Sequence, residues 1–253
     1  MDLIPKNLVS LHVGEEHIRT LAIDEVHKNP DLSDHLCLVE NAMNVLDVLR
    51  QVGGDAEDEK TVTLLGLRVF NDFASCWKLA STGYFQSATM MLRDVIETTN
   101  LVNAFHNDPE LIEKWREADG KMRKQKYSPF QIRMLLDKHQ GWEKSRRSEI
   151  YEMFCNLASH PTTEGFEMLR PDGKLAHNGP YFNPKTLRAV IEEAGKLAAQ
   201  AGVAFVIWLD PLNESARPAI RQYMLNAAEY YGKYIGEPYS PEKLAEINQL
   251  FSL

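Results

Sequence analysis

The chain has 253 residues, of which 44% are hydrophobic and 25% are charged, and its formal net charge is −8 at pH 7. This is the composition of a globular protein that can bury a substantial core, and it excludes a disordered or fibrous chain. The negative charge disfavours extended binding to nucleic acid or to an anionic membrane.

The chain begins with a segment, residues 1–30, that we predict to be an N-terminal arm. Its first residues, MDLIPKNLVSLHVGEEH, lack a cationic start followed by an apolar run, so no signal peptide is expected. The Asn29-Pro30 pair ends the segment, because proline disfavours the helical conformation in the residue before it. No long linker follows, so residues 31–253 are predicted to form a single helical-bundle domain.

Most of the remaining chain shows the apolar spacing that is typical of amphipathic helices. The clearest stripe runs from Leu187 to Trp208 and predicts one long helix, within 184–208, with a single buried face. Turn-forming stretches such as GGDAED at 53–58 and LDPLNES at 209–215 separate the helices. The other helices are expected at about 32–51, 59–81, 84–106, 109–117, 128–138, 144–159, 213–233 and 241–251.

One segment, residues 165–182, does not show the helical spacing. Its sequence, GFEMLRPDGKLAHNGPYF, places Pro171-Asp172-Gly173 between two short extended runs. Proline presets the backbone for a turn and glycine accepts a positive φ, so this pattern favours a hairpin. The sequence therefore predicts an all-α fold, a multi-helix bundle with one small β-hairpin near residues 165–182.

Three cysteines, Cys37, Cys76 and Cys155, lie far apart in the sequence. Their number and spacing indicate neither a disulfide framework nor a zinc ribbon and are consistent with a reducing cytoplasm. The longest strongly apolar run, VAFVIWL at 203–209, is too short to cross a bilayer. We therefore expect a soluble, cytoplasmic protein that has no membrane partner.

The charge is spread unevenly along the chain. Residues 114–147 contain eleven Lys and Arg against four Asp and Glu, a local charge of +7, which leaves −15 for the rest. Such a run indicates either a solvated helical face or a surface that faces RNA or another anion.

The expected helix at 84–106 carries a charged pair between two apolar surfaces. Arg93 and Glu97 are one helical turn apart, which allows them to form an ion pair. Charge is costly to bury unless it is paired, so this pair is expected to be partly buried or to lie at an interface.

A histidine ends the expected helix at 144–159, in the sequence YEMFCNLASHP. His160 precedes Pro161, so the helix should end there, and a helix C-terminus stabilises a protonated imidazole. On a helical wheel His160 lies beside Met153 and near Leu157 and Ile150, which are predicted to face the core. We therefore expect His160 to approach Arg93 or Glu97, either as a catalytic group or as a hydrogen-bonded core residue.

These two stretches carry a resemblance to a known family. GYFQSATMMLRDVIE at 83–97, followed about fifty residues later by YEMFCNLASHP at 151–161, resembles the helical proteins of the DUF5677 family. That family is similar to the wider group of HEPN bundles, and the resemblance covers about residues 60–210. The residues that carry it are Gly83, Tyr84, Arg93, Glu97, Tyr151, Ser159 and His160.

HEPN ribonucleases use an arginine and a histidine separated by four to six residues, at a dimer interface. Here Asn156 and His160 match the expected spacing, but Cys155 occupies the position of the arginine. The resemblance implies a homodimer that binds or cleaves RNA without a metal, in bacterial stress, toxin–antitoxin or phage-defence systems. In that role His160 would be the general acid/base or phosphate contact, Arg93 would stabilise phosphate charge, and Glu97 and Tyr151 would orient them.

Two alternatives remain open. In the first, the chain is a non-enzymatic interaction module in which Arg93, Glu97, Tyr151 and His160 form a structural polar network. In the second, Glu97 and His160 bind a metal, although the Glu-x-x-His pair that helix bundles use for this purpose is missing. The sequence contains no Walker-type loop and no Rossmann, HExxH or GxSxG motif, so neither a cofactor nor a metal is expected.

Overall fold

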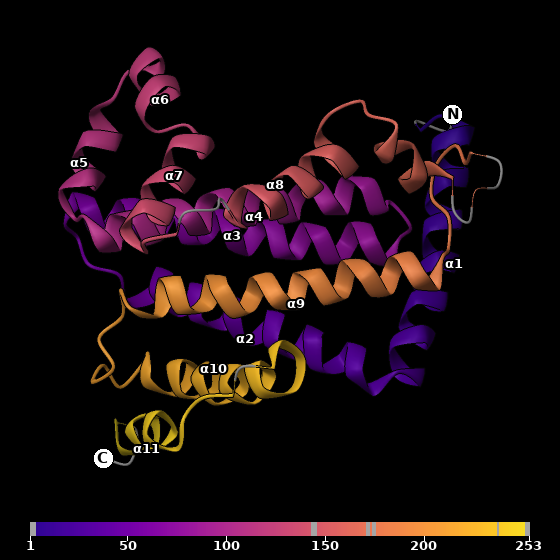
Figure 1. Ribbon diagram of the computed structural model, residues 1–253. Coiled ribbons are helices and arrows are strands. Elements are labelled where there is room, and N and C mark those ends of the chain that lie inside the picture. The colour runs from indigo at the N-terminus through magenta and orange to yellow at the C-terminus, as the bar shows by residue number, and fades with distance from the viewer. Residues whose placement is uncertain (1–3, 143–145, 171–172, 174–175, 237, 251–253) are drawn as a thin grey trace.

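The computed structural model describes residues 4–142, 146–170, 173, 176–236 and 238–250 (Figure 1). These residues form helices and connecting loops, with no β-strand among them, which confirms the prediction of an all-α bundle. Helix α9 packs against both α2 and α4, and α3 packs against all three. The four long helices at the centre are α2 (Pro30–Val52), α3 (Glu57–Ser81), α4 (Phe85–Asn107) and α9 (Pro184–Val206).

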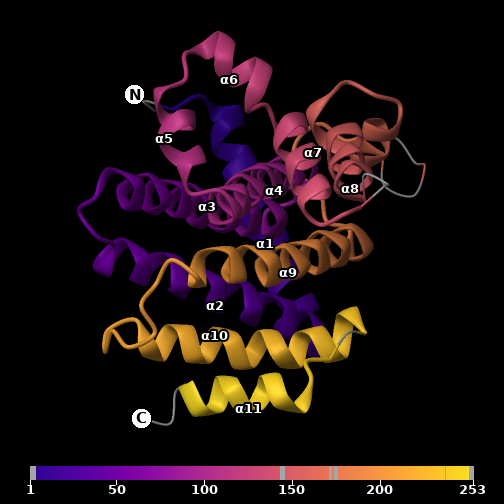
Figure 2. The same cartoon turned by 60° about the vertical axis from the view of Figure 1, so that its left-hand side comes forward.

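The remaining helices surround this centre in layers (Figure 2). On one side α10 lies against α2 and α9, with α11 outside it; on the opposite side α7 and α8 lie on α4. Helix α1 crosses one end of the bundle at a steep angle to α9 (Figure 1). The bounds of these helices are α1 (Lys6–Lys28), α5 (Glu110–Glu117), α6 (Gly120–Lys126), α7 (Pro129–His139), α8 (Arg146–Phe154), α10 (Arg217–Tyr230) and α11 (Pro241–Leu250).

The core consists of aliphatic and aromatic side chains from these helices. Burying one large apolar side chain contributes about 1.5–3 kcal/mol, so the aromatic residues contribute strongly. The largest fully buried aromatic side chains are Phe73, Phe85, Phe105, Phe154, Phe205 and Tyr223.

None of the helices in the described part of the chain combines the length and apolar content needed to cross a membrane.

Helix α9 is buried on more than the one face predicted for it. The expected stripe is buried from Leu187 to Phe205. Burial extends to Gly195, Ala199 and Gly202 on its flank, because α9 also contacts α2, α4 and α10. The small residues on this flank let neighbouring helices approach α9 closely.

Helix starts follow ordinary capping chemistry. Asn183 caps α9, accepting a hydrogen bond from the Thr186 N–H at 3.0 Å, and Pro184 occupies the first position of the helix. The Asp119 carboxylate likewise accepts from the Met122 N–H at 2.7 Å at the start of α6. Such caps satisfy backbone donors that have no partner within the helix.

The predicted N-terminal arm, residues 1–30, contains helix α1. Only Ile18 and Ala22 are buried along the described part of this helix, so its apolar pattern is too sparse for a prediction from spacing. The Tyr84 hydroxyl donates a hydrogen bond to Glu15 Oε1 at 2.8 Å and joins α1 to the start of α4. Helix α1 ends at Lys28, just before the predicted break at Asn29-Pro30, and α2 begins at Pro30.

The predicted β-hairpin at residues 165–182 is wrong, because the described residues of this segment include no strand. Glu164–Leu169 instead forms the 3-10 helix η2. Just before this helix, the Thr162 hydroxyl accepts a hydrogen bond from the Gly165 N–H at 3.0 Å. A threonine side chain that bonds the local backbone competes with a strand ladder, which explains the difference. The predicted turn residues Pro171 and Asp172 lie outside the described residues.

The connection between α8 and α9 is attached to the α3–α4 turn at Gly83. The Tyr181 N–H donates to the Gly83 carbonyl at 3.3 Å. Gly83 has a φ of +88°, and a Cβ at this position would lie 2.5 Å from the Tyr181 carbonyl oxygen. Glycine is therefore required here by both backbone conformation and close approach.

Candidate functional site

Three of the four predicted site residues meet where α8 lies on α4. The Tyr151 hydroxyl donates to Glu97 Oε1 at 2.6 Å and accepts from Arg93, whose Nη2 lies 2.5 Å away. Arg93 also forms an ion pair with Glu97 at 2.6 Å. We call Arg93, Glu97 and Tyr151 the α4–α8 cluster, and its charged side chains are 30% and 23% exposed.

The surroundings of the α4–α8 cluster raise the pKa of both Tyr151 and Arg93. Burial, and then the hydrogen bond to Glu97, raise the pKa of Tyr151 to about 12. Burial acts to lower the pKa of Arg93, but the Tyr151 hydroxyl and the Glu97 charge outweigh it, and the pKa is raised. Tyr151 therefore remains a neutral donor near neutral pH. The Arg133 guanidinium lies 3.8 Å from the centre of the Tyr151 ring and makes a cation–π contact with it.

His160, the fourth predicted residue, lies outside this cluster. Its side chain is exposed, and its imidazole makes no hydrogen bond to Arg93 or Glu97 in the described structure. The predicted orientation of the helix is wrong: Ile150 and Met153 are 47% and 42% exposed, whereas Phe154 is buried. The larger apolar surface of Phe154 faces the core instead.

The last turn before His160 is a π-helix, η1 (Cys155–Ser159). The His160 N–H donates to the Cys155 carbonyl at 3.0 Å, which closes this wide turn. A π-turn shifts the direction of the following side chains relative to an α-helix, so a regular helical wheel does not describe residues after Phe154.

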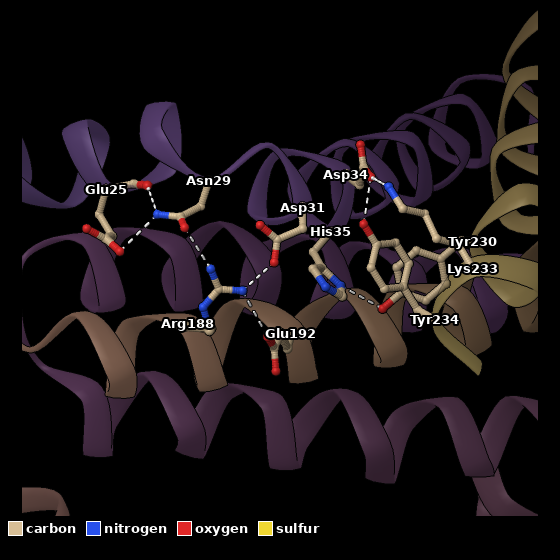
Figure 3. Close-up of polar contacts among 10 residues, drawn as sticks. All are labelled: Glu25, Asn29, Asp31, Asp34, His35, Arg188, Glu192, Tyr230, Lys233 and Tyr234. Atoms are coloured by element: carbon tan, nitrogen blue, oxygen red, sulfur yellow. Dashed lines mark hydrogen bonds and ion pairs between the residues drawn. The ribbon is translucent and has the colours of Figure 1, made fainter. Parts of the chain in front are cut away.

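A second polar cluster lies on the other side of the molecule, where α2 meets α10 and the π-helix η4 (Tyr231–Ile235) (Figure 3). His35 is only 3% exposed, and its Nδ1 lies 2.8 Å from the Tyr230 hydroxyl. The Tyr234 hydroxyl donates to Asp34 Oδ2 at 2.6 Å, and Lys233 pairs with the same carboxylate. We call Asp34, His35, Tyr230, Lys233 and Tyr234 the His35 cluster.

Burial lowers the pKa of His35, although the charges of Glu192 and Asp31 act in the opposite direction. The imidazole is therefore neutral near neutral pH. Hydrogen bonds to Lys233 and then Tyr234 lower the pKa of Asp34, which stays ionised. The cluster thus combines a neutral buried ring with an exposed ion pair.

An arginine on α9 extends this polar region toward α1 (Figure 3). Arg188 pairs with Asp31 and with Glu192, and it donates to Asn29 Oδ1 at 3.0 Å. The Asn29 amide in turn donates to Glu25 Oε1 at 2.9 Å. The end of α1, the start of α2 and the start of α9 are therefore joined through one guanidinium group.

Glycine at position 195 makes the contact between α9 and the His35 cluster sterically possible. A Cβ at Gly195 would lie 2.7 Å from His35 Nδ1 and 2.9 Å from the Tyr230 hydroxyl. Any other residue would force α9 away from α2 or break the hydrogen bond between His35 and Tyr230.

A third polar group lies between α3 and α4. Arg68 forms two hydrogen bonds with the Asp94 carboxylate, at 2.6 and 2.7 Å. Asp72 Oδ2 is buried and has no hydrogen-bond donor among the described residues. Burial, and then the proximity of Asp94, raise the pKa of Asp72 to about 8. A proton on Asp72 that is donated to Asp94 satisfies both carboxyl groups.

The fold and these contacts define the class of the protein as an all-α helical bundle with polar clusters enclosed between its helices. Comparisons with protein-family models, with curated proteins and with solved structures each found no match. In the described ranges, no group of three or more His, Cys, Asp or Glu side chains is arranged to hold a metal ion.

Proposed function

We propose that this chain is a non-enzymatic helical interaction module in which the α4–α8 cluster fixes α8 on α4. The closed set of hydrogen bonds supports this proposal, because Arg93, Glu97 and Tyr151 each find partners in the other two. A general base needs a lone pair directed at a substrate, and this cluster directs its acceptors at its own donors. The exposed His160 stands apart from it.

The outer face of α8 is the contact surface in this proposal. Ile150 and Met153 are exposed on it and lie one turn apart. Apolar side chains such as methionine are enriched at the centres of protein interfaces. The partner proposed is a second copy of the chain, and the α4–α8 cluster holds the helix that carries the contact.

The structural role of the cluster is tested with Tyr151→Phe. This change removes the hydroxyl but leaves the Arg93–Glu97 ion pair, so it should cost about 1 kcal/mol and lower the thermal midpoint by about 2–4 °C. Tyr127→Phe is the control, because the Tyr127 hydroxyl makes no hydrogen bond in the described structure. Equal midpoints for wild type and Tyr151→Phe would contradict the structural role.

Self-association is tested by light scattering on a size-exclusion column. Wild type should behave as a dimer, and Met153→Lys should shift the population toward monomer without changing the thermal midpoint. Leu212→Lys is the control, because Leu212 is an exposed apolar residue in a distant loop. A wild-type monomer at every concentration would rule out the proposed partner.

A second candidate, an RNA-binding or RNA-cleaving protein of the HEPN type, is favoured by the exposure of His160. The imidazole is accessible, and Asn156 of the same resemblance is also exposed. On this candidate a second copy contributes to the site, since HEPN ribonucleases place this histidine at a dimer interface. The proposed setting is then bacterial stress, toxin–antitoxin or phage defence.

The two candidates are separated by incubating the purified protein with total RNA and with structured RNA. If the protein is a ribonuclease, His160→Ala should abolish cleavage and leave the thermal midpoint unchanged. His106→Ala provides the control, as His106 is exposed at the end of α4. An absence of cleavage by wild type, or full cleavage by His160→Ala, would reject His160 as a catalytic residue.

A further inference from the structure

A groove of about 770 Å³ lies between α2 and α3, and none of its described lining residues belongs to the polar clusters described above. One wall is formed by α3, with Phe70, Phe73 and Trp77 spaced along one face of the helix. This wall is aromatic and apolar. Ala74, between these residues, is exposed on the same wall.

The other wall, from α2, carries a row of polar groups. Ser33, Cys37, Glu40 and Asn44 recur at helical spacing along the groove, beside the apolar Leu36 and Met43. Ser33, Glu40 and Asn44 make no side-chain hydrogen bond or ion pair in the described structure, so their polar atoms are available. Specific small-molecule sites combine an apolar lining with a few such polar groups.

The described lining residues of the groove carry one negative charge and no positive charge. Glu40 is its single charged lining residue in the part of the chain that the structure describes. Burial, and then the charges of Glu40 and Asp34, raise the pKa of the Cys37 thiol, which lies between them on α2. The negative charges that disfavour the Cys37 thiolate favour a cation beside Glu40.

The groove is short. Beyond Asn44 the same face of α2 carries Asp47, which accepts hydrogen bonds from Arg50 and Gln51. After about three helical turns, therefore, the lining of the groove gives way to charged side chains that bond to one another within α2. Its volume falls within the range of about 300–1,000 Å³ that small-molecule sites occupy.

We propose that the α2–α3 groove binds a small organic cation, an ammonium group carried on an apolar or aromatic body. Glu40 pairs with the ammonium group, and Phe70, Phe73 and Trp77 contact the body. The aromatic rings add cation–π attraction where the charge passes over their faces. This ligand site is independent of both candidate functions assigned to α8.

The proposal is tested by calorimetric titration with three ligands that share one body: phenylbutylamine, phenylbutanol and phenylbutyrate. The amine should bind roughly tenfold more tightly than the alcohol, and the carboxylate should bind most weakly of the three. Equal affinities for amine and alcohol would overturn the proposal, because the groove would then recognise only the apolar body.

Two variants locate the binding. Glu40→Gln should reduce the preference for amine over alcohol to roughly twofold or less, since the amide keeps the size but loses the charge. Glu117→Gln, at an exposed carboxylate on α5, should leave the preference unchanged. Ala74→Phe fills the groove from an exposed position and should abolish binding of both ligands while the protein remains folded. Unchanged amine binding in Glu40→Gln and Ala74→Phe would overturn the site.

Cys37 supplies an independent readout of occupancy. It is exposed, whereas Cys76 and Cys155 are buried, so a thiol reagent should modify Cys37 first. Saturating phenylbutylamine should slow this modification several-fold, and phenylbutyrate should leave the rate unchanged. The same rate with and without the amine would show that the ligand binds elsewhere and would overturn the assignment.

Discussion

The α4–α8 cluster and the His35 cluster both place polar groups between packed helices, but they satisfy these groups by different contacts. In the first, a tyrosine bridges an ion pair whose two charges are one turn apart on α4. In the second, the neutral side chain of His35, which is 3% exposed, forms a hydrogen bond with Tyr230, 195 residues away in the chain. The first cluster retains water contact and tolerates charge. The second buries its histidine away from water, leaves the Lys233–Asp34 ion pair exposed, and depends on close approach of helices.

The largest effect should come from Gly195→Ala, because the new Cβ would collide with His35 and Tyr230. Overpacking of a core contact costs about 2–3 kcal/mol, which lowers the thermal midpoint by roughly 5–10 °C. Gly14→Ala is the matched control, since nothing lies within 4 Å of a Cβ there and α1 should gain slightly from alanine. Equal midpoints for the two variants would mean that α9 and α2 are not held closely together.

Tyr230→Phe sharpens the comparison between the clusters. Removing this hydroxyl leaves His35 Nδ1 buried and without its partner, at a cost of about 2 kcal/mol. The free energy of unfolding should fall about twice as much as in Tyr151→Phe, because the Arg93–Glu97 ion pair remains in that variant. Chemical denaturation of both variants measures the difference. A larger loss of stability for Tyr151→Phe would contradict the expectation that the buried His35–Tyr230 hydrogen bond contributes more than the Tyr151 hydroxyl.

The His35 cluster should also make the protein sensitive to acid. Burial lowers the folded-state pKa of His35 below its unfolded value, so its contribution to stability is present near neutral pH. That contribution is lost as the pH falls below about 6.5 and through the folded pKa, at no more than about 1.4 kcal/mol per pH unit. Asp31 and Asp34 have lowered pKa values and stay ionised over this range.

The measurement is the thermal midpoint between about pH 7 and about pH 5, for wild type and for His35→Gln. The variant should be less stable at neutral pH but show a flatter profile, since glutamine does not titrate. His106→Gln, at an exposed histidine, should keep the slope of wild type. Identical slopes for His35→Gln and wild type would place the acid sensitivity elsewhere.

The smallest effect is expected at Asp72, in the α3–α4 contact. Its folded pKa of about 8 lies above the unfolded value, so stability falls as the pH rises between the two. Asp72→Asn replaces the protonated carboxyl and should stabilise the protein by about 1 kcal/mol near pH 9, because half-exposed groups are partly screened. Near pH 4, at the lower end of this range, the variant and wild type should agree. Asp24→Asn, at an exposed carboxylate, should show no such trend.

The positions of most helices could be predicted from the sequence because apolar spacing and capping residues coincide. The predicted helix at 84–106 became α4 (Phe85–Asn107), and the one at 59–81 became α3 (Glu57–Ser81). The N-terminal helix α1 was missed because it buries so few side chains, and α6 because it is short and basic.

Helical spacing predicted the site only where its residues are neighbours on one helix, whereas Tyr151 was placed with them by the family resemblance. Arg93 and Glu97 stand one turn apart, so their pairing followed from spacing. The face of α8 was ambiguous, since both Ile150–Met153 and Phe154 offer apolar surfaces, and the π-turn before His160 has no signature in the spacing. His35 and Tyr230 meet through tertiary packing alone, which a single sequence does not encode as a pattern.

The central place of α9 has a consequence for how the chain is made. Helix α9 completes the core between α2 and α4, yet it lies about 150 residues after α2 in the chain. During synthesis the apolar faces of α2, α3 and α4 therefore emerge long before the helix that covers them. Long-range contacts of this kind slow folding and leave apolar surface exposed meanwhile. We expect nascent chains that end before Pro184 to bind chaperones, and release to follow emergence of α9.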